Sequence, residues 1–423
     1  MGSKPVTNRL THDQLATLVP ELLLTGQLID RSGMAHLIAA FGRDGMGEVA
    51  IEEWMAASPV YTGRIRAALG IDGDGVADMI KCLQLDIGAP PQFMDFRYQI
   101  DDEYHGSFVL DHCGALLDVE PMGDEYVTTM CHTIEDPTFD ATAIATNRRA
   151  RIRPVHRPPR VPVDRSPHCE WTITIEPDRD ELPLPEVTKP MLATRAAIIE
   201  LSQIDADATD GLVDYRGPVV DDLAFDEWST SALVRIVEEV TLQHQLLALG
   251  FLDSVRRRTD EATADDIFDK QLTGIAGIAA ERVTAAVLDS KTDAAALVDA
   301  LNLNPVFGPV QYTGFRAELI DDEHVEVHIP HTSAALEDGG WMRLLVSGRL
   351  ASLQAAATAI DPTWVVGESI EAEVDGSEET VVRIGRGEAQ RECGEVAIVR
   401  FSAGSSFTFT DRGPSRPLPL SVV

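Results

Sequence analysis

The feature of this sequence that most constrains its fold is a pattern that occurs twice. In the first half, Phe96 stands before an Asp-Asp-Glu triplet and is followed by His112. In the second half, Phe315 stands before the same triplet and is followed by His331. The separation from Phe to His is 16 residues in both copies, and an Arg follows each Phe. Self-similarity of this kind indicates a tandem duplication of one structural unit.

Each copy begins with helical patterns and continues with strand patterns. A capping box at Thr11 and Gln14 opens the first helical region, and Gly and Pro divide that region into several predicted helices. Residue alternation then predicts strands at 93–100, 105–110, 151–155 and 170–175, with a helix at 124–133. The second half repeats the order, with helices at 225–258, 264–288 and 294–301, strands at 315–320 and 324–329, a helix at 341–359 and three strands ending near residue 402. The predicted fold is α+β, with two tandem related units, each made of N-terminal helices followed by an antiparallel sheet with a packed helix.

The two units differ in their reactive residues. We place the first unit at 1–176, a Pro-rich linker at 177–192 and the second unit at 193–423. The position of Cys113 is occupied by Thr332 in the second copy, and the Cys131-His132 pair falls on Leu350-Ala351. We pair Cys169 with Cys393, because each stands before a short apolar run. The second unit is therefore a degenerate copy, and we expect the chemistry in the first.

The charge of the chain excludes several classes of partner. There are 69 acidic residues against 35 basic ones, for a net charge of −34, which argues against nucleic acid and anionic membranes as partners. No run of 18 apolar residues occurs, and residues 1–6 lack the apolar stretch of a signal peptide. Five Cys in 423 residues are too few for a disulfide framework. We expect a cytoplasmic protein from a GC-rich bacterial genome or a salt-adapted organism.

Residues 105–169 concentrate the groups that could carry chemistry. The three Cys in this stretch, Cys113, Cys131 and Cys169, each adjoin a His. One interpretation is a metal site formed by these three thiolates, holding zinc or another divalent transition metal. A second makes Cys113 or Cys131 a nucleophile, with His112 or His132 as base and Glu135 or Asp136 as the orienting carboxylate. A third is that the Cys residues are small buried side chains. The sequence contains no C-x-x-C and no H-E-x-x-H motif.

The order of these residues resembles a known family. Cys113 on a hairpin strand, Cys131 on the next helix with Glu135-Asp136 shortly after, and Cys169 opening an aromatic strand are similar to the L-2-amino-thiazoline-4-carboxylic acid hydrolase-like family over residues 60–176. Helices before an antiparallel sheet also resemble, more distantly, the vinyl-reductase-type small-molecule-binding domains. The first resemblance implies hydrolysis of a C–N bond in a small cyclic amidine or amide.

An Arg-rich segment at 147–160 stands out in this acidic chain. Its guanidinium groups, with Arg151, Arg153 and Arg157 as the main candidates, would suit a carboxylate, so we expect them to bind an anionic small-molecule substrate. The alternative is that they pair with acidic residues of the same chain, or with another subunit of a homo-oligomer. Our leading hypothesis is a hydrolase-like enzyme acting on a C–N bond of a small carboxylated substrate. The alternative is a non-catalytic sensory module that binds a small molecule, a metal or haem.

Overall fold

The structure confirms an α+β fold with two tandem units. It is a computed structural model that describes residues 6–419. Most of residues 1–6, in which the sequence predicts no signal peptide, therefore lies outside the described residues. Each unit contains a four-stranded antiparallel sheet, and the two sheets have the same strand order, β1-β2-β4-β3 and β5-β6-β8-β7. Within residues 6–419, no helix is both long and apolar enough to cross a membrane.

The elements of the first unit follow a short 3-10 helix, η1 (Val6–Arg9). They are α1 (His12–Leu69), α2 (Val76–Leu83), β1 (Met94–Ile100), β2 (His105–Cys113), α3 (Gly114–Val119), η2 (Glu120–Met122), α4 (Asp124–Thr128), the π-helix η3 (Thr129–Ile134), α5 (Glu135–Ile144), β3 (Ala150–His156) and β4 (Cys169–Ile175). A long connection with α6 (Thr188–Met191), α7 (Arg195–Ile198) and η4 (Phe225–Glu227) leads to the second unit.

The second unit repeats this order. Its elements are α8 (Thr230–Arg256), α9 (Glu261–Val287), α10 (Ala294–Leu303), α11 (Val310–Thr313), β5 (Arg316–Asp321), β6 (His324–Pro330), α12 (Ala334–Glu337), α13 (Met342–Val346), α14 (Ala351–Ile360), β7 (Trp364–Val374) and β8 (Ser377–Arg386). The chain ends with α15 (Gly394–Val399), η5 (Ala403–Ser406) and an extended segment.

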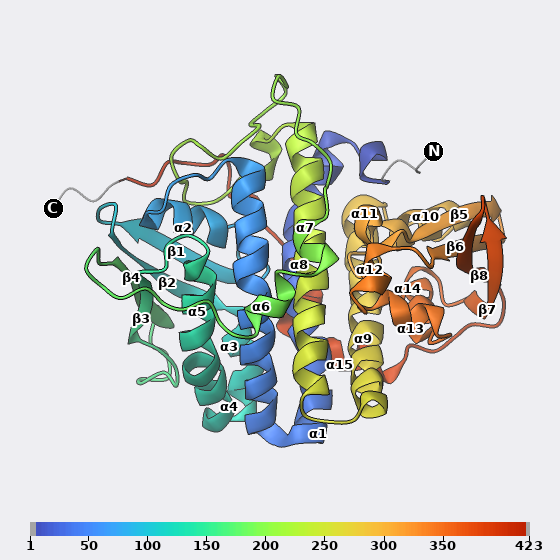
Figure 1. The fold of residues 1–423 in the computed structure, drawn as a ribbon, viewed down its shortest axis with the longest axis horizontal. Helices are drawn as coiled ribbons and strands as arrows, with labels where there is room; N and C mark the ends of the chain where they lie inside the picture. Colours follow the sequence, from blue (N-terminus) through green and yellow to red (C-terminus); the bar gives the residue numbers. More distant parts are fainter. Residues whose placement is uncertain (1–5, 420–423) are drawn as a thin grey trace.

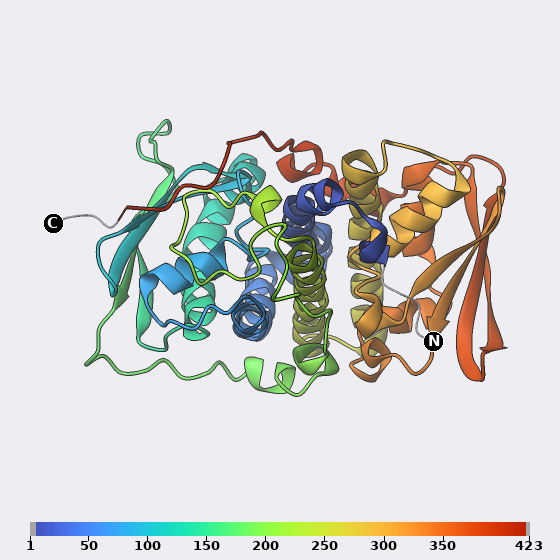
Figure 2. The ribbon, with the colours of Figure 1, turned by 90° about the horizontal axis from the view of Figure 1, so that it is seen from above.

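The two sheets lie at opposite ends of the molecule, with the long helices between them (Figures 1 and 2). The helix α1 packs along both α8 and α9, so the two units share one helical centre. The C-terminal segment then crosses back to the first sheet (Figure 2). There the backbone N–H of Thr410 donates to Gln92 Oε1 at 2.8 Å, and Arg412 forms a 2.8 Å ion pair with Asp95.

The helix α1 is a helical hairpin. The predicted capping box is confirmed, because Thr11 and Gln14 cap one another at its start. The chain then continues through Pro20 and reverses at Gly42, whose φ of 73° and ψ of −179° are essentially restricted to glycine. The sequence predicted several separate helices, whereas the structure has two long arms joined at this kink, at the bottom of Figure 1.

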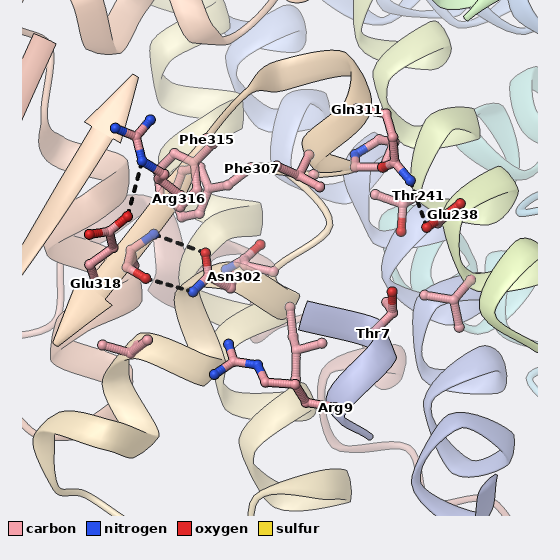
Figure 3. A pocket seen from close by; sticks show the side chains of 18 of the residues that line it. Thr7, Arg9, Glu238, Thr241, Asn302, Phe307, Gln311, Phe315, Arg316 and Glu318 are labelled. Carbon is pink, nitrogen blue, oxygen red and sulfur yellow. Dashed lines mark hydrogen bonds and ion pairs between the residues drawn. The ribbon is translucent and has the colours of Figure 1, made fainter. Parts of the chain in front are cut away.

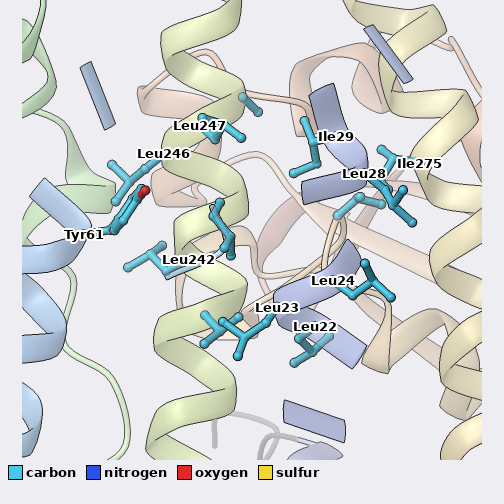
Figure 4. Packing of buried hydrophobic residues seen from close by; sticks show 14 of the residues in the cluster. Leu22, Leu23, Leu24, Leu28, Ile29, Tyr61, Leu242, Leu246, Leu247 and Ile275 are labelled. Atoms are coloured by element: carbon cyan, nitrogen blue, oxygen red, sulfur yellow. The ribbon is translucent and has the colours of Figure 1, made fainter. Parts of the chain in front are cut away.

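Leucines from both units fill the helical centre. Figure 4 shows Leu22 and Leu28 of α1, Leu242 and Leu246 of α8 and Ile275 of α9 among the side chains that meet there. All five have no exposed surface. Burying one such side chain stabilises the fold by about 1.5–3 kcal/mol before the entropy of ordering it is subtracted. The two units therefore share a hydrophobic core.

The end of the second unit differs from the prediction. The predicted helix at 341–359 is two helices, α13 and α14, and the last predicted strand is the helix α15. In α15, Val396 and Val399 are one helical turn apart and contact the glycine-containing face of α9, at Gly277 and Gly274 respectively. The pairing of Cys169 with Cys393 is wrong, because Cys393 caps this helix whereas the counterpart of β4 is β8.

Candidate functional site

A partly open cavity of about 110 Å³ lies between α1 and the first sheet. The first arm of α1 contributes Asp30 and Arg31 to its wall, the second arm contributes Glu53, and the turn after α2 contributes Asp86. Glu135, the first residue of α5, completes the set of ionisable side chains. The rest of the wall is mostly apolar and includes Met34, Met46, Trp54, Met94, Phe96, Phe139 and Phe251.

The kink of α1 brings two acidic side chains together. Asp30 and Glu53 lie at similar distances along the chain on either side of Gly42, so they face one another across the helical hairpin. Trp54 Nε1 donates to Asp30 Oδ2 at 2.9 Å. Glu53 is only 2% exposed, and burial, reinforced by the nearby Asp30, raises the pKa of its carboxyl well above the usual range. Burial therefore favours the protonated form of Glu53, which hydrogen-bonds to Asp30.

Asp86 and Arg31 also line the cavity, and the protein neutralises their charges to different extents. Asp86 Oδ1 accepts hydrogen bonds from Tyr61 Oη at 2.9 Å and from the backbone N–H of Gly88 at 2.7 Å. Burial nevertheless raises the pKa of Asp86 to about 6. Arg31 Nε lies 2.9 Å from Asp118 Oδ2, and these two side chains are 5% and 6% exposed. The charge of Arg31 is thus neutralised within the protein.

Glu135 enters the cavity from a local irregularity of its helix. The π-helical turn η3 lies between α4 and α5, and such turns are frequent at functional sites. Burial raises the pKa of the Glu135 carboxyl to about 8, although Arg157 acts in the opposite direction. Its Oε2 is buried and has no hydrogen-bond partner among the described residues. A carboxyl with a pKa near neutrality is suited to exchanging a proton with a bound molecule.

The three predicted metal ligands converge, but they do not form a metal site. Cys113, Cys131 and Cys169 are all buried, and the pKa of Cys131 responds to the other two thiols. Across residues 6–419, no group of three or more His, Cys, Asp or Glu side chains is arranged to hold a metal ion. These residues therefore do not fit the zinc or other divalent metal that the sequence suggested.

The same thiols are poor candidates for a nucleophile. Burial raises the pKa of Cys113 to about 12 and also raises the pKa values of Cys131 and Cys169. Cys113 Sγ accepts a hydrogen bond from the N–H of Leu116 and lies 3.8 Å from Met94 Sδ. Within the described chain, no His hydrogen-bonds to any of the three sulfur atoms. The thiols are neutral at pH 7, as expected for the third interpretation, that of small buried side chains.

The predicted bases, His112 and His132, and the predicted carboxylate Asp136 do not line the cavity. His112 lies between the rings of Phe93 and Phe407, with centroids 6.4 and 6.1 Å away. His132 Nε2 is 2.7 Å from the carbonyl oxygen of Pro158. Asp136 forms an ion pair with Arg157 outside the cavity wall. Of the five residues predicted to be catalytic, Cys131, His132, Glu135, Asp136 and His112, the structure thus places only Glu135 in the cavity wall.

The arginines predicted to bind substrate are engaged within the chain. Arg153 donates to both carboxylate oxygens of Asp140 at 2.8 Å. Arg151 donates to the carbonyl oxygens of Ala150 and Asp180 at 2.8 and 2.9 Å. Arg157 pairs with Asp136 and lies over the ring of Trp171. None of the three lines the cavity. Arg153 and Arg157 pair with acidic residues of the same chain, as the alternative stated, whereas Arg151 binds backbone carbonyl oxygens.

Four ionisable residues of the cavity wall were not predicted from the sequence: Asp30, Arg31, Glu53 and Asp86. A signal for one of them was present. Leu23, Gln27, Asp30, Met34 and Leu37 recur at helical spacing, so Asp30 occupies a position on the buried face of its helix. An acid at such a position is unusual and indicates a function or a buried partner.

A larger pocket of about 440 Å³ lies in the second unit, between η1, α8, α10 and β5 (Figure 3). Its polar side chains are largely satisfied. Asn302 exchanges two 2.9 Å hydrogen bonds with the backbone of Ala317, Gln311 donates to Glu238 at 2.7 Å, and Arg316 donates to Glu318 at 3.1 Å. Its unpartnered buried atoms, among the residues that the structure describes, are neutral oxygens of Thr7 and Gln311. The smaller cavity of the first unit is therefore the stronger candidate.

Together, the fold and the site define a duplicated α+β protein with a carboxyl-lined cavity in its first unit. Comparison with known proteins finds no family model, no curated protein and no solved structure that matches the chain. The geometry of this cavity is therefore the basis for assigning a function.

Proposed function

We propose that this protein binds a small organic molecule in the cavity between α1 and the first sheet, and that Glu135 exchanges a proton with it. The observation that supports the proposal is the buried, unpartnered Oε2 of Glu135 at the cavity wall. An unpaired polar atom in a protein interior is costly, on the order of 1–3 kcal/mol, so its position favours a ligand that would complete it. A cytoplasmic location belongs to the same proposal, because all five Cys are free thiols.

Hydrolysis of a C–N bond is the catalytic form of this proposal. A water molecule would attack the carbon, and its oxygen would form the new C–O bond. The ionised form of Glu135 would accept the water proton and pass it to the leaving nitrogen as the C–N bond breaks. The substrate need not carry a carboxylate, because Arg151, Arg153 and Arg157 do not line the cavity.

A non-catalytic binding module is the second candidate. It is favoured by the neutral thiols and by the lack, in the described structure, of a second ionisable side chain hydrogen-bonded to Glu135. The variant Glu135→Gln distinguishes the two candidate functions. In an enzyme this change removes turnover while binding persists, whereas in a binding module no substrate is consumed by either protein.

A fragment screen by ligand-observed NMR tests the proposal. We expect compounds that bind the wild type to lose binding in Ala115→Leu, because Ala115 is 3% exposed and lines this cavity. The matched control is Ala317→Leu, since Ala317 is 5% exposed and lines the pocket of the second unit. Incubation of the binders with the wild type and with Glu135→Gln, followed by proton NMR, then reports turnover. Binding that survives Ala115→Leu but is lost in Ala317→Leu would refute the assignment of the cavity.

A further inference from the structure

The cavity wall has more carboxyl groups than positively charged side chains. Asp30, Glu53, Asp86 and Glu135 line it, and Arg31 is the one cationic side chain in the wall. Because Arg31 pairs with Asp118 at 2.9 Å, that pair carries no net charge. The remaining four groups are neutral or negative at any pH. An anion placed here would face them at low dielectric, where like charges repel strongly.

Two of these carboxyl groups share a hydrogen bond, and a third holds an unused oxygen. Glu53 hydrogen-bonds to Asp30, whereas Glu135 Oε2 is buried and lacks a hydrogen-bond partner among the described residues. Asp86 differs, because Tyr61 and Gly88 already donate to it. Glu53 is more than nine-tenths buried, so its contact with Asp30 is shielded from bulk solvent. The wall therefore presents carboxyl oxygens from two arms of α1 and from α5, and the guanidinium of Arg31, the cationic donor among them, is held by the ion pair with Asp118.

We propose that the ligand of this cavity is a small organic cation with N–H donors and an apolar body. This inference rests on the proposed function, in which the cavity binds a small molecule. The N–H groups bond to Glu135 Oε2 and replace the proton between Glu53 and Asp30, while the carbon skeleton contacts the Met and aromatic side chains of the wall. The ligand class is thus opposite in charge to the anion that the Arg-rich segment suggested.

The volume limits the size of the cation. A cavity of roughly 150 Å³ lined by apolar side chains accommodates benzene, and this one measures about 110 Å³. A molecule smaller than benzene fits without rearrangement of the wall. Acetamidinium, acetamide and acetate have nearly the same shape and carry charges of about +1, 0 and −1 at pH 8, so they separate charge from size.

Binding of a cation should release protons. The groups that face the site are Asp30, Arg31 and Glu53 on α1, Asp86 with Tyr61 behind it, and Glu135 with Arg157 and the three buried thiols behind it. Burial holds Glu53 and Glu135 in their neutral forms near pH 7, and a bound cation favours their charged forms. The affinity for the cation should therefore increase from pH 6 to pH 8.

The test is thermal unfolding of the full chain with each of the three compounds, against NaCl of equal ionic strength. We expect acetamidinium to raise the Tm at pH 8, with a shift at least three times that of acetamide and no shift with acetate. Glu53→Gln should reduce the acetamidinium shift at least threefold. Glu52→Gln is the matched control, because the neighbouring Glu52 points out of the cavity and pairs with Arg257 and Arg258.

Calorimetry in two buffers of different ionisation enthalpy adds a measurement that needs no variant. Acetamidinium should release protons on binding to the wild type, and acetamide should release none. Equal or stronger stabilisation by acetate or acetamide overturns the cation inference and leaves the proposed function intact. If none of the three binds, the cation inference also fails, and the proposed function fails with it only if the fragment screen finds no binder that Ala115→Leu removes.

Discussion

Replacing Glu135 with Gln should remove a pH-dependent loss of stability. In the wild type, this carboxyl is buried at the cavity wall with one oxygen unpartnered among the described residues, and burial raises its pKa from 4.5 to about 8. The folded chain therefore retains a proton that the unfolded chain gives up near pH 4.5. Because the raised pKa belongs to an acid, stability is greatest at low pH, is lost as the pH rises from about 4.5 to about 8, and is then constant.

The magnitude follows from the two pKa values. Each tenfold difference in proton affinity between the folded and unfolded chains is worth about 1.4 kcal/mol. Between pH 5 and pH 9, the wild type should lose about 4 kcal/mol of unfolding free energy through this group alone. Glutamine has nearly the same size and no charge at any pH, so Glu135→Gln should gain on the wild type by this amount over the same interval.

Urea unfolding followed by tryptophan fluorescence, repeated at intervals from pH 5 to pH 9, measures this difference. All other titrating groups are common to the two proteins and cancel in the comparison. Glu186→Gln is the control, because Glu186 is exposed, pairs with Lys189 and does not line the cavity. Its difference from the wild type should stay constant with pH. A difference between Glu135→Gln and the wild type that changes by less than about 1 kcal/mol would refute a buried neutral carboxyl.

One substitution and one labelling experiment probe the surroundings of the cavity. Asp118→Asn leaves the buried guanidinium of Arg31 uncompensated and should lower the free energy of unfolding by about 3–5 kcal/mol in urea titrations; a loss below about 1 kcal/mol would show that this pair is solvated. Cys113 should react slowly with iodoacetamide at pH 7.5, since burial keeps its thiol protonated, and the half-buried Cys393 should be alkylated first in a peptide mass-spectrometric time course. Rapid labelling of Cys113 alone would instead revive the nucleophile interpretation.

The duplicated fold was accessible from the sequence because its signals are local. The hairpins β1–β2 and β5–β6 follow from residue alternation around Asp-rich tips, and the two tips are alike in detail. His105 Nδ1 lies 2.9 Å from Asp102 Oδ1, and His324 Nδ1 lies 2.9 Å from Asp321 Oδ1. In both units a His at the start of the second strand closes the turn. Such short-range interactions are encoded within a few residues, which is why the predictions of these two hairpins agree with the structure.

The errors in the fold arise where tertiary contacts decide. The run Val-Ala-Ile-Val at 396–399 has the composition of a strand, yet it forms α15 because two of its valines fit against glycines of α9. The single reversal of α1 at Gly42 was hidden for a similar reason. Several Gly and Pro residues punctuate that region, and nothing local distinguishes the one at which the chain turns.

The site was predicted in part. The convergence of Cys113, Cys131 and Cys169 was part of the metal prediction, because they lie on neighbouring elements of one unit. The chemistry assigned to them was not supported, since the burial that brings them together also keeps the thiols neutral. Asp30 and Glu53 were missed because their proximity depends on the reversal of α1, which joins residues far apart in the sequence.

The acidity of the chain acquires a different meaning once surface and interior are separated. A net charge of −34 gives little information about a ligand, because most acidic side chains are solvated or paired with arginines. The acids of the cavity wall are different, since each is held at a cost that an apolar side chain of similar size would avoid. Glu135 bears that cost with one oxygen unpartnered in the described structure, and Glu53 bears it beside a second acid, Asp30. A ligand that donates hydrogen bonds to these carboxyl groups would offset the cost, and an anion would increase it. The distribution of buried carboxyl groups therefore carries the functional information, and it favours a cation in the first unit.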